Sequence, residues 1–216
     1  MIIDCRLVDK IMPKYKLIYF NLRARAEVSR LIFALANQEY EEVRFGLDEW
    51  PTYKPQMLLG QAPVLEIDDV KLPQSITIAR YLAKQFNLAG RDNLEQAKAD
   101  AVVDTNVDII IAITPPFQAK DETKKKELLD KFFEQDLPKQ LQNLEILGKL
   151  YGNNGPFFLG SDITWADLMF YATSELFLGQ RSNALDEYPW LQANRAAVEQ
   201  QPRIAEYLKN RPPTPY

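Results

Sequence analysis

The chain has 216 residues, of which 46% are hydrophobic and 26% are charged. This length suits one large domain or two small ones, and this much apolar surface excludes a disordered chain. The 26 basic and 30 acidic side chains give a formal net charge of -4, which argues against a nucleic acid as the partner.

Two residue types that serve many active sites are almost missing from the sequence. It contains no histidine and a single cysteine, Cys5. These counts exclude Ser-His-Asp and Cys-His nucleophiles, zinc held by histidine or several cysteines, and CxxC redox pairs. They also exclude an intrachain disulfide, so we expect a reducing, cytoplasmic location.

The first eleven residues, MIIDCRLVDKI, carry mixed charges and lack the apolar run of a signal peptide. No later segment reaches the roughly 18 apolar residues of a membrane span. We therefore interpret residues 1–11 as an N-terminal extension without a function of its own, and we expect no membrane partner.

The next part of the chain, residues 12–88, predicts an α/β domain. Apolar residues at i, i+3, i+4 and i+7 predict a helix over 25–37, between two strands that a right-handed crossover makes parallel. A turn-type Asp-Asp pair then predicts a hairpin, and Ser75 is a good N-cap for the helix that follows. The strands are expected at 15–20, 41–45, 64–67 and 70–72.

Strand signals stop after this domain, and the remaining chain predicts helices alone. We therefore expect an all-helical domain over 94–216, with residues 89–93 as the linker. Thr164 and Asp167 have the spacing of a capping box at the start of one helix. The helices are expected at 94–113, 122–151, 164–179, 189–200 and 202–210.

Candidate functional residues gather in the first domain. Tyr19 ends the first strand, where ligands of α/β units bind, and its hydroxyl can donate a strong hydrogen bond to a thiolate. The GQAP segment at 60–63 precedes a strand, where a cis proline would free the backbone before it to pair with an extended peptide. Gln74 and Ser75 open a helix whose N-terminus favours a carboxylate. Packing, an ordinary turn and an ordinary N-cap are the structural alternatives.

An acidic stripe marks the first long helix, where Asp100, Asp104 and Asp108 recur at i, i+4 and i+8. Such like-charge pairs cost about 0.2–0.5 kcal/mol each unless a cation relieves them. The stripe indicates either a solvated face or a site for a cation or amine at an interface.

Several motifs in fixed order resemble the sigma class of cytosolic glutathione S-transferases. They are YKLIYFNLRARAEVSRLIFA, Trp50 with Lys54, GQAPVLEID, QSITIARYLAKQF and SDITWADL, and the resemblance runs from Met12 to Tyr216. It implies a thioredoxin-like βαβ-ββα domain followed by an all-helical domain. It also implies glutathione as co-substrate, so that the reactive thiol comes from outside the chain.

The resemblance also implies which residues form the site. Tyr19 would stabilise the glutathione thiolate with Arg25 beside it, and Asp108 would reach the partner's glutathione across a homodimer interface. The implied glutathione-binding residues are Tyr19, Arg25, Trp50, Lys54, Gly60, Gln61, Ala62, Pro63, Gln74, Ser75 and Asp108. The implied pocket for a small hydrophobic electrophile is formed by Phe20, Leu22, Ala24, Met169, Thr173 and Tyr216.

The chain departs from the prostaglandin-isomerising members of the class. Gln61 stands in place of a lysine, and Val107 stands in place of one of three aspartates that hold a divalent cation, so we expect no metal. Conjugation of glutathione to hydrophobic electrophiles is therefore the expected function. Isomerisation of prostaglandin H2 to D2 and a catalytically weak, S-crystallin-like structural role are the alternatives.

Overall fold

The structure is a computed structural model that describes residues 13–214. The extension expected at 1–11 lies outside the described residues. Between residues 13 and 214, no helix is long and apolar enough to cross a membrane.

The N-terminal half is built on one mixed sheet with the strand order β2-β1-β3-β4. The central strand β1 (Tyr15–Phe20) runs parallel to β2 (Glu41–Phe45). It runs antiparallel to β3 (Val64–Ile67), which forms the expected hairpin with β4 (Val70–Pro73). The four predicted strands are confirmed. The inner strands β1 and β3 carry most of the buried residues of the sheet, whereas the edge strands β2 and β4 are half-buried or exposed apart from Phe45.

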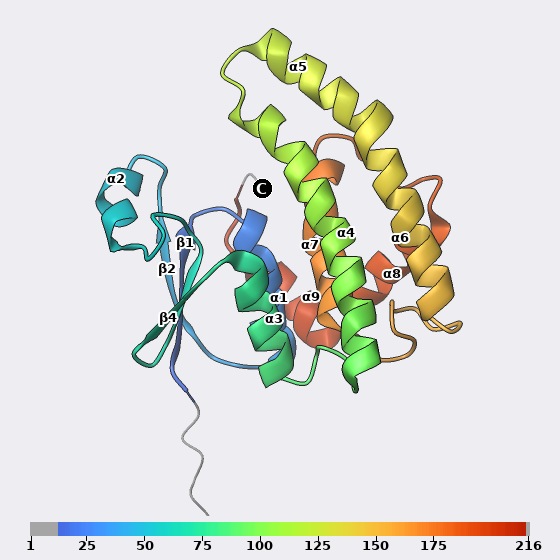
Figure 1. The fold of residues 1–216 in the computed structure, drawn as a ribbon, viewed down its shortest axis with the longest axis horizontal. Coiled ribbons are helices and arrows are strands. Elements are labelled where there is room, and N and C mark those ends of the chain that lie inside the picture. The colour runs from blue at the N-terminus through green and yellow to red at the C-terminus, as the bar shows by residue number, and fades with distance from the viewer. Residues whose placement is uncertain (1–12, 215–216) are drawn as a thin grey trace, which may run out of the picture.

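Two helices, α1 (Glu27–Ala36) and α3 (Ser75–Gln85), cover the face of the sheet that is turned toward the helical half, as Figure 1 shows. A turn of 3-10 helix at Ala24–Ala26 precedes α1. Ser75 is the first residue of α3 and not its N-cap, which corrects the expectation, since Gln74 takes the capping position. A short helix α2 (Trp50–Tyr53) was not predicted, because its four residues are too few to show a period.

The C-terminal half is helical, as expected, but two helix boundaries differ from the prediction. The first helix continues one turn beyond Ile113, through Pro115 and Pro116. The predicted helix at 122–151 is interrupted by a π-helical turn at Phe132–Asp136. The helices are α4 (Asn93–Gln118), α5 (Glu122–Lys131), α6 (Leu137–Tyr151), α7 (Trp165–Leu178), α8 (Pro189–Glu199) and α9 (Pro202–Asn210).

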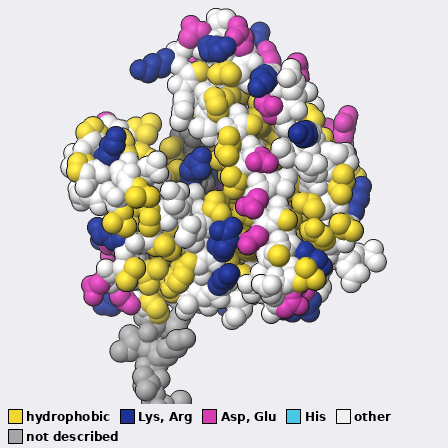
Figure 2. Space-filling view, viewed as in Figure 1, with side chains coloured by type: hydrophobic (Ala, Val, Ile, Leu, Met, Phe, Trp, Pro, Cys, Tyr) yellow, Lys and Arg dark blue, Asp and Glu magenta, His cyan; other side chains and the backbone are white. Residues whose placement is uncertain are grey.

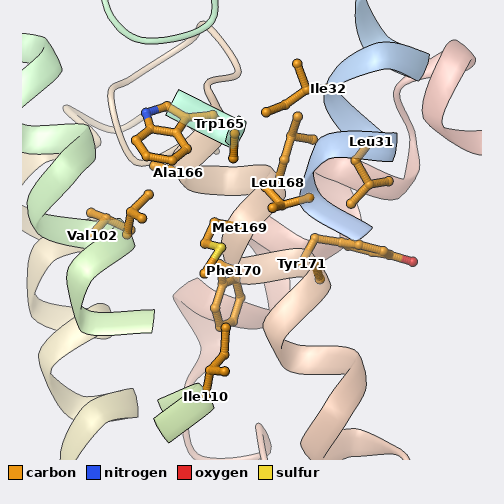
Figure 3. Packing of buried hydrophobic residues seen from close by; sticks show 14 of the residues in the cluster. Leu31, Ile32, Val102, Ile110, Trp165, Ala166, Leu168, Met169, Phe170 and Tyr171 are labelled. Atoms are coloured by element: carbon orange, nitrogen blue, oxygen red, sulfur yellow. The ribbon is translucent and has the colours of Figure 1, made fainter. Parts of the chain in front are cut away.

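Helix α7 forms the centre of the hydrophobic core, which is continuous between the two halves. Trp165, Leu168 and Phe170 on α7 are fully buried, and Figure 3 shows them among side chains from α1 and α4. The Trp165 backbone N–H donates to the Leu88 carbonyl at 2.9 Å, which ties the start of α7 to the chain just after α3. The shared core holds α1 and the loop before it at a fixed place against α7.

Candidate active site between the two halves

A cleft of about 440 Å³ opens at the carboxyl end of β1, between the loop after β1, the loop before β3 and the start of α3. It brings together all the glutathione-binding residues expected from the sequence except Tyr19, Lys54 and Asp108. The lining residues are Phe20, Arg25, Trp50, Gly60, Gln61, Ala62, Pro63, Pro73, Gln74 and Ser75.

The turn before β3 has the backbone form expected from the sequence. The Ala62-Pro63 peptide bond is cis, and Gly60 has a φ of +59°. A Cβ at Gly60 would lie 3.6 Å from Cε of Lys54, so the Lys54 side chain runs across this glycine at the edge of the cleft. Gln61 and Ala62 precede the first paired residue of β3, Val64, which leaves their backbone outside the sheet ladder and beside the cleft.

The start of α3 forms the opposite wall of the cleft. Gln74 has a φ of +74°, a left-handed conformation that costs a non-glycine residue about 1–3 kcal/mol and is typical of functional sites. Among residues 13–214, no side chain caps the helix, so its first N–H groups and its positive dipole end face the cleft without a capping side chain. N–H groups and a hydroxyl in this arrangement favour an anion such as a carboxylate.

Aromatic rings form the floor of the cleft. The Trp50 ring lies 5.1 Å from Phe20 and stacks on Phe45 at 5.8 Å, measured between centroids. Phe45 also stacks on Tyr53 at 4.2 Å. The unpredicted helix α2 is thus fixed to the sheet by ring packing, which places Trp50 in the cleft wall.

Tyr19 lies under the loop between β1 and α1 and is 5% exposed. Its hydroxyl oxygen accepts a hydrogen bond from the Arg25 backbone N–H. Burial raises the pKa of Tyr19, while this hydrogen bond and the charges of Arg25 and Arg30 oppose the rise. The hydroxyl therefore keeps its proton near neutral pH and acts as a hydrogen-bond donor.

A second, apolar pocket adjoins the cleft, and Arg25 and Ser75 line both. In this structure it is nearly closed, with a volume of about 10 Å³. Its lining residues are Ala24, Arg25, Val28, Ser75, Ile76, Ile110, Met169, Ala172, Thr173 and Leu176. The Thr173 hydroxyl is buried and has no hydrogen-bond partner in the part of the chain that the structure describes.

The electrophile pocket expected from the sequence is brought together only in part. Ala24, Met169 and Thr173 meet in the apolar pocket, as expected. Phe20 lines the first cleft instead, because it packs on Trp50, and Leu22 lines neither cavity. Tyr216 lies outside the described residues.

The prediction from the sequence did not include Pro73 in the first cleft or most of the apolar residues in the second pocket. Two signals point to some of them. Met169, Thr173 and Leu176 are spaced i, i+4 and i+7 and share one face of α7, and Ile76 follows Ser75 at the start of α3.

The acidic stripe lies on the exposed side of α4, where Figure 2 shows acidic side chains in a row. Asp100 pairs with Arg80 at 3.0 Å, which explains one end of the stripe. Asp104 and Asp108 are exposed, and Asp108 lines neither cavity. Between residues 13 and 214, no three or more acidic, cysteine or histidine side chains are grouped so that they could hold a metal ion.

Comparison with known protein families identifies the class of protein that has this fold and this cleft. Residues 15–84 match the N-terminal domain of glutathione S-transferases, and residues 107–211 match their C-terminal domain. The chain therefore belongs to the glutathione S-transferases, in a sigma-like class, and the predicted family, fold and enzyme class are confirmed. The family also implies glutathione as co-substrate.

Individual proteins of the family are similar to the chain over nearly its whole length. The chain is 39% identical over 203 residues to hematopoietic prostaglandin D synthase of Gallus gallus, which covers 94% of this chain and 99% of the relative. The solved structure of rat hPGDS complexed with a quinoline is 36% identical, with a TM-score of 0.87 over 94% of this chain and 100% of that one. The sigma class GST of Fasciola hepatica is 27% identical, with a TM-score of 0.86 over 94% of this chain and 99% of that one.

Proposed function

We propose that the protein conjugates glutathione to hydrophobic electrophiles, with the Tyr19 hydroxyl holding the glutathione sulfur as a thiolate. The observation that carries this proposal is the buried Tyr19 hydroxyl, which accepts a hydrogen bond from the backbone N–H of Arg25, a residue that lines both the cleft and the apolar pocket. A donor at this junction stabilises a sulfur anion that faces an apolar reactant.

In this proposal, different residues of the cleft bind different parts of glutathione. Trp50 and Lys54 hold the glycyl end, the backbone of Gln61 and Ala62 pairs with the cysteinyl part, and the start of α3 receives the γ-glutamyl carboxylate. The thiol proton passes to solvent, and the thiolate attacks the electrophilic carbon while Arg25 stabilises the developing negative charge. With chlorodinitrobenzene, the new C–S bond replaces the C–Cl bond, and chloride leaves to solvent.

The proposal includes a homodimer. Asp108 is exposed and lies outside both cavities of its own chain, so it would act on the γ-glutamyl amine of the partner's glutathione. Sedimentation of the purified chain with and without glutathione measures the oligomeric state directly.

The apolar pocket must open before an electrophile binds, because about 10 Å³ holds no reactant. Met169 is the side chain most suited to this movement, since its unbranched chain has three rotatable bonds. Among the described residues that line the pocket, Arg25 alone is charged, which favours hydrophobic electrophiles.

The test is conjugation of glutathione to chlorodinitrobenzene by the wild type and by Tyr19→Phe. Loss of one charge-assisted hydrogen bond should lower turnover about 10- to 100-fold and leave the glutathione Kd nearly unchanged, because the peptide contacts lie elsewhere. Tyr15→Phe, a buried tyrosine on the same strand, is the matched control. An unchanged rate in Tyr19→Phe would remove Tyr19 from the mechanism, and tight binding without turnover in any of the proteins would favour a structural role of the S-crystallin kind.

Isomerisation of prostaglandin H2 to D2 is a second candidate, favoured by the similarity to the hematopoietic prostaglandin D synthases reported above. The same thiolate would act on the peroxide bridge and be regenerated, so no glutathione would be consumed. Conversion of prostaglandin H2 to D2 that needs glutathione but does not deplete it would distinguish this activity from conjugation.

A further inference from the structure

Arg30 on α1 is a buried arginine that no step of the proposed reaction uses. Its side chain is 0% exposed and forms ion pairs with Glu27 at 3.1 Å and with Glu42 at 2.6 Å. A buried charge needs such partners, since removing it from water without them is very costly. Arg30 therefore has a fixed place between α1 and β2.

The remaining hydrogen bonds of Arg30 go to the loop that carries Arg25. Its Nη1 donates to the Leu22 carbonyl at 2.8 Å and to the Arg23 carbonyl at 3.2 Å. The next residue, Ala24, has a φ of +33°, which is unfavourable for alanine. Arg30 thus holds the strained loop between β1 and α1 by hydrogen bonds to its backbone carbonyls.

The conformation of this loop determines which group hydrogen-bonds to the Tyr19 hydroxyl. Arg25 directly follows the strained residue, and its backbone N–H donates to the Tyr19 hydroxyl. The Arg30 guanidinium itself lies 5.9 Å from the centroid of the Tyr19 ring. Its Nη2 is buried without a hydrogen-bond partner in residues 13–214, a cost of about 1–3 kcal/mol that stability alone does not explain.

A tyrosine hydroxyl has one proton and two lone pairs. When the Arg25 N–H occupies a lone pair, the proton points elsewhere, and the O–H bond becomes a better donor because linked hydrogen bonds polarise one another. We infer that Arg30 is a positioning residue for Tyr19: it fixes the loop carbonyls at 22 and 23, and so directs the Tyr19 proton to the glutathione sulfur. This inference rests on the proposed role of Tyr19.

The charged and titratable groups around Arg30 come from several elements. They are Glu27 on the same helix, Glu42 on β2, Tyr40 just before β2, Tyr19 on β1 and Tyr207 on α9, and Arg211 after α9 shares Glu27 with Arg30. Both carboxylates pair with Arg30, so Arg30→Lys keeps the buried charge balanced while it removes the planar fork that reaches two carbonyls and two carboxylates at once.

The experiment measures the ultraviolet absorbance of the thiolate of glutathione bound to each variant, as a function of pH. For Arg30→Lys we expect about three- to tenfold less thiolate at neutral pH, kcat for chlorodinitrobenzene lower by the same factor, and a glutathione Kd within about twofold of wild type. A purely structural role would change stability and leave the thiol titration where it was.

Two further variants keep the test decisive. Arg195→Lys is the matched control, because Arg195 also pairs with a glutamate, at 3.1 Å, and lies over a tyrosine ring, at 4.2 Å, but on α8. It should titrate like wild type. If Arg30→Lys does not fold, Glu42→Gln replaces it in the test, because it removes one of the two carboxylates that pair with the Arg30 guanidinium. Glu42→Gln should shift the titration of the glutathione thiol in the same direction.

The outcomes separate this inference from the proposed function. An unshifted titration in Arg30→Lys, or in Glu42→Gln where it must substitute, overturns the positioning role even if Tyr19→Phe abolishes the thiolate. An unshifted titration in Tyr19→Phe overturns the proposed function itself, whatever the Arg30 variants do.

Discussion

Ala24 shows how a single residue stores strain beside the site. At its φ of +33° the Cβ atom is crowded, and a left-handed conformation costs an L-residue about 1–2 kcal/mol. Glycine adopts this region freely, so Ala24→Gly should raise the free energy of unfolding by about 0.5–1 kcal/mol. Urea unfolding measures the change. Ala36→Gly, in the regular last turn of α1, is the control and should destabilise the protein, while a loss of stability in Ala24→Gly would show that the loop is not strained.

Hydrophobic periodicity does not detect residues such as Arg30. The sequence predicts one apolar face for α1, but the helix is buried on several sides, and its buried residues include Glu27, Ser29 and Arg30. The location of Tyr19 follows from the end of β1, whereas its contact with Arg25 depends on the backbone of the loop, which no residue pattern in the sequence specifies.

Among the elements, α7 has the most explicit start signal. The carboxylate of Asp167 is fully buried and accepts four hydrogen bonds, from the Phe158 N–H and Asn194 Nδ2 at 2.8 Å each, and from the Thr164 N–H at 2.8 Å and its hydroxyl at 3.0 Å. The capping box predicted from Thr164 and Asp167 is confirmed. The structure adds that the same carboxylate also ties α7 to α8 and to the segment before it.

Asp167→Asn should therefore be strongly destabilising. An amide offers one acceptor oxygen, and its NH2 group would face an N–H donor, so we expect a loss of about 2–4 kcal/mol in the free energy of unfolding. Equilibrium unfolding in urea measures it, with the exposed Asp162→Asn as control. A loss no larger than that of the control would contradict this account of α7.

Helix ends are the part of the elements that the sequence predicts least well. Pro115 and Pro116 suggest an end at Ile113, but they lie in the last turns of α4, where the carbonyls they leave unpaired belong to Ile111 and Ala112, near the end of the helix. The π-helical turn before α6 has a similar origin, because Pro138 cannot donate to the carbonyl four residues earlier and the wider turn accommodates this.

At the scale of the whole molecule, buried tyrosines link stability to pH. Burial is the largest cause that raises the pKa of each member of this set. The set is Tyr15, whose pKa rises to about 12, together with Tyr19, Tyr40, Tyr171 and Tyr207. Folding thus favours the protonated phenols, and this contribution is complete below the unfolded pKa near 10.

Stability should fall as the pH rises above about 10, because the unfolded tyrosines then lose protons that the folded ones keep. Each such tyrosine contributes a decline of up to about 1.4 kcal/mol per pH unit. Urea unfolding at pH 8 and pH 11 measures the decline, and Tyr171→Phe should make it shallower by the share of one tyrosine. Equal stability at both pH values would contradict the expectation.

The order of the two halves is predictable from the sequence because strand signals end before residue 94. The contact between the two halves is not predictable from the sequence, since it depends on charged residues far apart in the chain. Arg211 after α9 bridges Glu27 on α1 at 2.7 Å and Glu175 on α7 at 2.6 Å, and Arg23 reaches the same Glu175 at 3.1 Å. No local pattern reveals such a cluster, although it ties the loop between β1 and α1 to α7 and to the chain after α9.

The separation of the two cavities has a consequence for how such an enzyme diversifies. Ile110, Met169, Ala172, Thr173 and Leu176 shape the apolar pocket from α4 and α7 without lining the cleft. After a gene duplication, substitutions at these positions can accumulate in one copy without changing any residue that lines the cleft. The two copies can then differ in the helical side of the apolar pocket, while Ala24, Val28 and Ile76 on its other side, in the sheet half, stay the same.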